Sequence, residues 1–189
     1  MKRLVWLVDV SLDGFMSGPN EELDWLGANV DDEMWQDVFE LLGTVDTALF
    51  GRLTYQNFEQ YWPAVSGNPA STKYDLDFSR WIDATPKYVA STTLSNLQWK
   101  NSVLLGTDIR DSVSRLKKQS GKSILIFGSR ELVLQLLDSS LIDEWRIRIH
   151  PVVLGVGRPL FRNGSERHNL KLIHSSAFAS GVMNLRYEL

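Results

Sequence analysis

Cysteine is absent from this 189-residue chain. Its absence excludes disulfides, thiolate nucleophiles and cysteine metal sites, and it suits a protein of the reducing cytoplasm, where we expect this one. No apolar run approaches the ~20 residues that a membrane helix needs. With a formal net charge of −3 and no large basic block, nucleic acid and membrane surfaces are not expected as partners.

Motifs for metal or nucleophilic chemistry are also missing. The three histidines, His150, His168 and His174, lack a metal-ligand spacing, so we expect no metal, and His150 fits an ordinary sheet residue. The segment GVGRPLF (155–161) starts like a dinucleotide fingerprint, but it lacks the third glycine and runs into Pro159. Neither a Walker lysine nor a G-x-S-x-G elbow is present.

A single α/β domain over residues 1–189 is predicted from what remains. The chain is 43% apolar and 23% charged, which is typical of a globular domain. The N-terminal MKRLVWLVDV meets acidic residues and lacks a cleavage site, so it fits a first core strand better than a signal peptide. Strands are predicted at 3–10, 45–51, 86–92, 102–105, 122–128, 144–154, 170–178 and 182–189. Helices are predicted at 31–42, 53–62, 71–84, 108–121 and 129–140, with a loop at 63–71.

Strand–helix alternation predicts a three-layer fold around a mostly parallel sheet. Several strands are continuous apolar runs, as expected where both faces of a sheet are covered. The last three strands have no helices between them, and two of them alternate polar with apolar residues. We therefore expect an antiparallel edge at the C-terminal end of the sheet.

Two strand-to-helix junctions have the chemistry of a phosphate site. Gly51-Arg52-x-Thr54 follows one apolar strand, Gly128-Ser129 follows another, and Ser91-Thr92-Thr93 ends a third. Ligands of α/β sheets bind at the carboxyl ends of strands, where helix N–H groups attract anions. For the first junction alone, a glycine turn with a surface arginine and a structural cap is the favoured explanation. Three polar strand ends together favour one dinucleotide site.

The segment VSLDGFMSGPNEELDWL (10–26) has two interpretations. It is either a turn that Trp25 fixes to the core, or a flap that brings Asp13 or Asp24 near a ligand.

These motifs, in order, resemble the dihydrofolate reductase superfamily. The series is S-L-D-G, D-W-L, G-R-x-T-Y, K-Y-V-x-S-x-T-L, I-F-G-S-x-x-L and L-I-D-E-W-R-I-R-I-H-P-V-V-L-G-x-G-x-P-L-F. It is most similar to the branch that contains the reductase domain of the bifunctional riboflavin-biosynthesis deaminase-reductase. The resemblance implies a dihydrofolate reductase-like sheet of about eight strands, NADPH as cofactor, and hydride transfer to a small pterin-like or ribosylamino-pyrimidine substrate. It also suggests a homodimer, as does a high aromatic content (Tyr61, Trp62, Trp99, Trp145).

The resemblance also implies roles for particular residues. Arg52, Thr54, Ser91 and Thr92 match positions that hold the adenosine 2′-phosphate, and Gly128 and Ser129 match the diphosphate turn, with serine in place of the usual second glycine. Further cofactor contacts are implied for Val10, Gly51, Phe127, Arg130, Glu131 and Leu132. Substrate contacts are implied for Asp24, Trp25, Met34, Phe58 and Pro151, and Asp13 is the candidate for the proton relay.

One departure concerns the substrate. Dihydrofolate reductases keep an arginine for the folate glutamate where this chain has Ala84-Thr85-Pro86. We therefore expect poor activity on dihydrofolate. A nucleotide- or metabolite-binding module that has lost catalysis remains the alternative.

Overall fold

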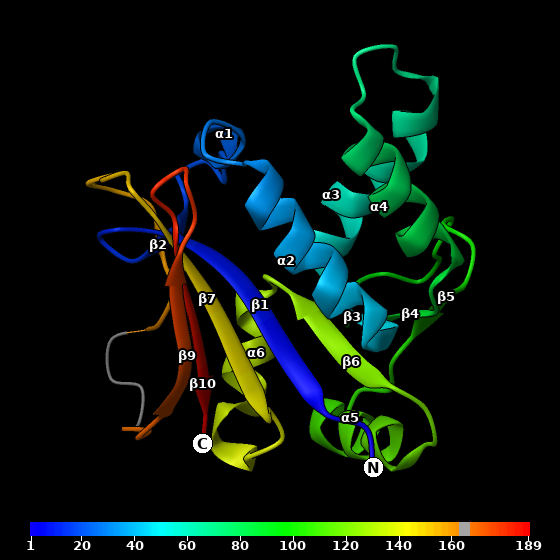
Figure 1. Cartoon of the computed structure of the whole chain (residues 1–189). Coiled ribbons are helices and arrows are strands. Elements are labelled where there is room, and N and C mark those ends of the chain that lie inside the picture. The colour runs from blue at the N-terminus through cyan, green and yellow to red at the C-terminus, as the bar shows by residue number, and fades with distance from the viewer. Residues whose placement is uncertain (163–166) are drawn as a thin grey trace.

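The computed structural model describes residues 1–162 and 167–189 and is built on an eight-stranded sheet (Figure 1). The strand order is β5-β4-β3-β6-β1-β7-β10-β9. Neighbours from β5 to β7 are parallel, whereas β10 is antiparallel to β7 and to β9. The predicted α/β class, the mostly parallel sheet and its antiparallel C-terminal edge are therefore confirmed.

The strands of this sheet are β1 (Leu4–Ser11), β3 (Val45–Gly51), β4 (Lys87–Ala90), β5 (Ser102–Leu104), β6 (Ser123–Phe127), β7 (Glu144–His150), β9 (Lys171–Ala177) and β10 (Met183–Glu188). The helices are α1 (Asp24–Gly27), α2 (Asp32–Gly43), α3 (Arg52–Tyr61), α4 (Lys73–Ala84), α5 (Ile109–Lys118) and α6 (Arg130–Leu136), with 3-10 turns η1 (Trp62–Gly67) and η2 (Leu137–Ser139).

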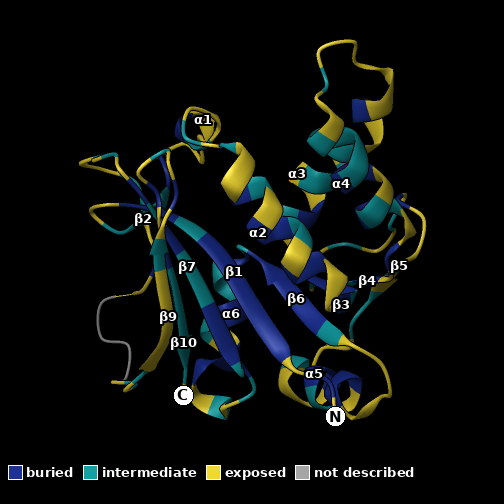
Figure 2. Ribbon diagram, in the orientation of Figure 1, coloured by how far each residue is buried: buried dark blue, intermediate teal, exposed yellow. Residues whose placement is uncertain are grey.

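Strand β1 shows why the sheet is covered on both faces. Alternate residues of a strand point to opposite faces. Trp6 and Val8 pack with α5 and α6, whereas Val5 and Leu7 pack with α2 and α4. Figure 2 shows β1 and β6 as largely buried strands with the helices around them. This is the predicted three-layer arrangement.

Side-chain caps place several helix starts where the sequence predicts them. Asp31 accepts a hydrogen bond from Met34 N–H, Asp108 accepts one from Asp111 N–H, and Thr72 and Asp75 form a capping box. Such caps satisfy N–H groups that have no partner within the helix. None of the described helices is long and apolar enough to cross a membrane.

Three local predictions need correction. The strand predicted over 144–154 ends at His150, because Pro151 has no N–H for the ladder. The loop predicted at 63–71 begins with η1 (Trp62–Gly67). A small second sheet, in which β2 (Phe15–Ser17) pairs with β8 (Arg158–Pro159), was not predicted.

Candidate functional site

A cavity of about 660 Å³ lies along the carboxyl ends of β4, β3, β6 and β1. This volume is in the usual range for a small-molecule or cofactor site. Of the predicted cofactor residues, Val10 does not line this cavity. The others do, and they are Gly51, Arg52, Thr54, Ser91, Thr92, Phe127, Gly128, Ser129, Arg130, Glu131 and Leu132. Val10 is buried in the same core cluster as Trp6 and Val8.

The two predicted strand-to-helix junctions contact each other. The backbone N–H of Gly51 donates to Ser129 Oγ at 2.9 Å. Gly128 and Ser129 both adopt the left-handed conformation, with φ of +50° and +52°. That conformation is unfavourable for serine, and the hydrogen bond to Gly51 offsets part of its cost. Serine thus forms the turn in which glycine is usual, with its side chain joining β3 to β6.

Polar groups on the β3–β4 side of the cavity remain available to a ligand. Arg52 is exposed, and its one hydrogen-bond partner among the described residues is Gln56, at 3.0 Å. No side chain caps α3, and the residues at its start, Gly51 to Thr54, line the cavity. Ser91 Oγ accepts hydrogen bonds from Thr93 and Leu94 N–H, which fixes the turn after β4. This arrangement suits an anion such as a phosphate.

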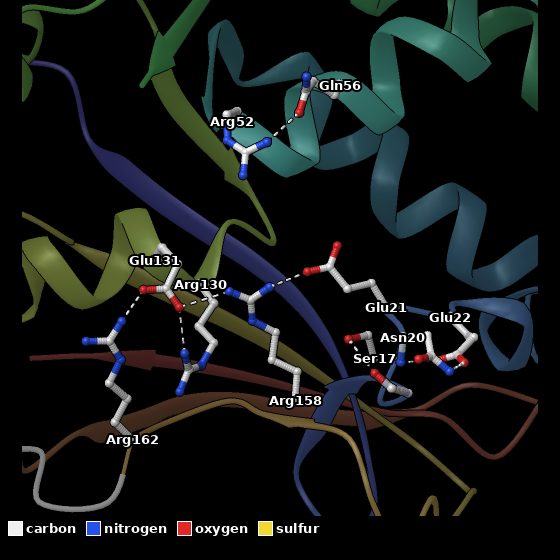
Figure 3. Close-up of polar contacts among 11 residues, drawn as sticks. Ser17, Asn20, Glu21, Glu22, Arg52, Gln56, Arg130, Glu131, Arg158 and Arg162 are labelled. Carbon is white, nitrogen blue, oxygen red and sulfur yellow. Dashed lines mark hydrogen bonds and ion pairs between the residues drawn. The ribbon is translucent and has the colours of Figure 1, made fainter. Parts of the chain in front are cut away.

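A network of ion pairs on the other side of the cavity includes residues that the sequence analysis missed. Glu131 on α6 pairs with Arg130 at 2.7 Å, with Arg158 at 3.0 Å and with Arg162. Arg158 also reaches Glu21 at 2.6 Å (Figure 3). Burial raises the pKa of Glu131, but the arginines outweigh it and hold that pKa below its usual value. The network therefore keeps Glu131 ionised and links the 18–23 loop to α6.

A second missed cluster lies at the β1–β7 end of the cavity. Asp9 on β1 accepts a hydrogen bond from Arg148 at 2.7 Å and contacts His150 Nε2 at 2.8 Å. Both partners are on β7, and the parallel register places Arg148 beside Asp9. Asp9 and Arg148 line the cavity, whereas His150 is fully buried behind them. No local motif marks this cluster, because its members meet only through strand pairing.

The predicted substrate residues are divided between the cavity and its surroundings. Met34 and Phe58 line the cavity. Trp25 is buried next to it and packs edge-on against His150, with ring centroids 5.1 Å apart. Asp24 and Pro151 are exposed and do not line the cavity.

Asp13 is placed outside the cavity, which does not fit the predicted proton relay. Its carboxylate accepts hydrogen bonds from Ser11 Oγ and from the N–H groups of Leu154 and Gly155. The bond from Ser11, more than the two from the backbone, lowers the pKa of Asp13, so the group stays ionised. Asp13 thus holds the loop after β7 to the turn after β1.

The fold and cavity define the class of this protein, an α/β protein of the dihydrofolate reductase-like fold with a cavity of about 660 Å³ at its strand ends. Residues 2–184 match the model of the RibD C-terminal domain. The chain belongs to this family.

Similar proteins agree with this assignment. Bacillus subtilis YyaP is 34% identical over 186 residues, which is 98% of this chain and 94% of that protein. A solved structure from Shewanella sp. PV-4, described as a riboflavin biosynthesis protein, has a TM-score of 0.74 at 23% identity and covers 100% of this chain and 98% of its own. The Thermotoga maritima diaminohydroxyphosphoribosylaminopyrimidine deaminase/5-amino-6-(5-phosphoribosylamino)uracil reductase has a TM-score of 0.67 at 12% identity. This chain spans 56% of that bifunctional protein.

Proposed function

We propose that the protein is an NADPH-dependent reductase that transfers a hydride to a small pterin-like or ribosylamino-pyrimidine substrate. The family and its reductase-type neighbours support the reaction class, and the cofactor and substrate are our proposal. The observation that carries it is the single cavity that joins an anion-binding end at Arg52 to a polar cluster at Asp9 and Arg148.

The length and chemistry of this cavity fit a dinucleotide. From β4 to β1 there are three strand spacings, or roughly 14 Å. Arg52, Thr54, Ser91 and Thr92 would hold the 2′-phosphate at one end. Gly128 and Ser129 would hold the diphosphate in the middle, where φ is positive at both residues and no side chain caps α6. The bound cofactor would supply the hydride, so the protein has only to orient the substrate and exclude water.

The proposal is tested by following NADPH oxidation with pterins and with the ribosylamino-pyrimidine as candidate substrates. We expect stoichiometric NADPH oxidation with one of them. Tight NADPH binding without turnover of any candidate would support the alternative, a binding module that keeps the fold without catalysis.

A further inference from the structure

The Asp9–Arg148 pair is not used by the proposed cofactor contacts, although both residues line the cavity. Arg148 has only 7% of its surface exposed. Its Nη2 donates to Asp9, but Nε and Nη1 have no hydrogen-bond partner among the described residues. Buried donors are almost always paired in folded proteins. Arg148 lines the cavity, and among the described residues it uses one of its five N–H donors, so a ligand with an acceptor atom fits beside it.

Asp9 offers the complementary group. Its side chain is 20% exposed and lines the same cavity. Burial alone would raise the pKa of Asp9, but Arg148 and His150 beside it hold that pKa below the usual value. The carboxylate therefore stays ionised, and it can accept an N–H from a ligand but not donate a proton to it.

The surrounding charges cancel, which restricts the ligand. Asp9 faces Arg148, and on the next strand Asn184 lies in register with Arg148. Asn184 in turn donates to Asp37 of α2, which pairs with Arg186. An anionic ligand group at Arg148 would be repelled by the adjacent carboxylate of Asp9. A cationic group at Asp9 would be repelled by the guanidinium of Arg148. An uncharged group that is both donor and acceptor fits without either penalty.

We propose that Asp9 and Arg148 recognise the substrate through the amide edge of an uncharged heterocycle. A ring N–H donates to the Asp9 carboxylate, and the neighbouring ring C=O accepts from Arg148. Pteridinones and pyrimidinones present such an edge. This inference rests on the proposed function, in which the cofactor occupies the rest of the cavity.

The test uses two matched ligands, lumazine and 3-methyllumazine, which differ in the ring N–H between two carbonyls. Binding is measured by fluorescence titration of the chain saturated with NADP⁺, which prevents turnover. A hydrogen bond to a charged group corresponds to roughly 10- to 150-fold in affinity. We expect the wild-type chain to bind lumazine more tightly than its methyl analogue by a factor in that range.

Three variants assign the effect to the pair. Arg148→Met should weaken lumazine binding by roughly 10- to 150-fold while NADP⁺ binding changes less than about threefold. Asp9→Asn should reduce the discrimination between the two lumazines to a few-fold. Arg146→Met is the matched control, because Arg146 is on the same strand, pairs with Glu144 at 2.6 Å and does not line the cavity. It should bind both lumazines as the wild type does.

Several results would overturn the inference. These are failure of the wild-type chain to bind lumazine, equal binding of the two lumazines, and an equal loss of NADP⁺ and lumazine in Arg148→Met. The first two need no variant, so they decide the matter even if a variant fails to fold. A chain that discriminates the lumazines but never oxidises NADPH would contradict the reductase proposal and uphold this inference. A chain that oxidises NADPH but binds the two lumazines equally would support the reductase proposal and contradict this inference.

Discussion

Lys87 shows how a side chain that looks like a surface cation in the sequence becomes part of the core. It is fully buried, and its Nζ donates to the carbonyl oxygens of Ile82 and Thr85 at 2.7 and 2.8 Å. The ammonium also lies 4.5 Å from the ring centroid of Trp99. Burial lowers the pKa of Lys87 from 10.5 to about 8. Lys87 therefore fixes the end of α4, and it is not available to a ligand.

This pKa predicts a pH-dependent contribution to stability. The folded state loses the Lys87 proton near pH 8 and the unfolded state near 10.5. Between these values the unfolded state binds more protons, so stability from this group rises with pH. We therefore expect the difference in unfolding free energy, wild type minus Lys87→Met, to increase by on the order of 2 kcal/mol between pH 8 and pH 10. Urea titrations of both proteins at pH 8 and pH 10 measure these free energies. A difference that stays constant or decreases as the pH rises would contradict the prediction.

Arg52 is the residue on which we expect cofactor preference to depend. A charge-assisted contact to the 2′-phosphate contributes roughly 1.5–3 kcal/mol, or about 10- to 150-fold in affinity. Arg52→Ala should therefore remove most of the preference for NADPH over NADH while NADH binding stays nearly constant. Arg80→Ala is the control, because Arg80 is exposed, pairs with Asp77 and lies outside the cavity. Equal weakening of both cofactors by Arg52→Ala would mean that Arg52 is structural.

At the scale of elements, the strand-to-helix junctions follow from the sequence more closely than the strand ends do. The predicted strand at 45–51 is observed as Val45–Gly51, and its helix begins at Arg52. Apolar runs and glycine punctuation are local signals, so a single sequence reveals them. The β2–β8 pair was missed because its strands are two and three residues long and pair across more than 140 positions.

The turn at Ser129 gives a prediction that separates backbone strain from hydrogen bonding. Ser129→Gly removes the cost of the positive φ, which stabilises the fold by about 1 kcal/mol. It also loses the hydrogen bond from Gly51 N–H, which destabilises the fold by about the same amount. Ser129→Ala loses the bond and keeps the strain. We expect Ser129→Gly to be within about 0.5 kcal/mol of the wild type and Ser129→Ala to be about 1–2 kcal/mol less stable. Chemical denaturation of the three proteins checks this order, and equal stability of the two variants would contradict it.

At the scale of the whole molecule, neither of the two cations near the missing folate arginine, Lys87 and Arg80, lines the cavity. Lys87 is buried under α4, and Arg80 is paired with Asp77 outside the cavity. A lost charged contact costs about 2–5 kcal/mol, or roughly 30- to several-thousand-fold in affinity. We therefore expect dihydrofolate turnover to be absent or very poor, with a smaller substrate preferred. Assays of NADPH oxidation compare dihydrofolate with the smaller substrates. A micromolar KM for dihydrofolate with turnover of several per second would contradict this expectation.

The homodimer remains a prediction, but its physical basis changes. Trp99 and Trp145 are buried within the chain and Trp62 lines the cavity, which leaves Tyr61, 56% exposed, as the one surface residue of the four, so these residues form no exposed aromatic patch. Strand β9 is one of the two outer strands of the sheet, and Leu172 and Ile173 on it are 49% and 42% exposed. An apolar edge strand with open backbone groups favours pairing with another chain.

We predict that the dimer contact lies at this edge. Sedimentation should show a dimer for the wild type and a monomer for Ile173→Lys. A wild-type monomer at high micromolar concentration would contradict the dimer. A dimer that survives Ile173→Lys would contradict its placement at β9.

By itself, the sequence determined the α/β class, most strands and helices, and the residues on the Arg52 side of the cavity. These depend on local periodicity, glycine positions and helix starts, and Gly51, Arg52, Gly128 and Ser129 each belong to such a junction. Only the tertiary structure decided which residues form the opposite side of the cavity. Asp9 and Arg148 are 139 positions apart and meet through the register of β1 on β7. Arg158 reaches Glu131 because β8 pairs with β2. Asp13 lies outside the cavity, where its carboxylate accepts hydrogen bonds from Ser11 and from the loop after β7.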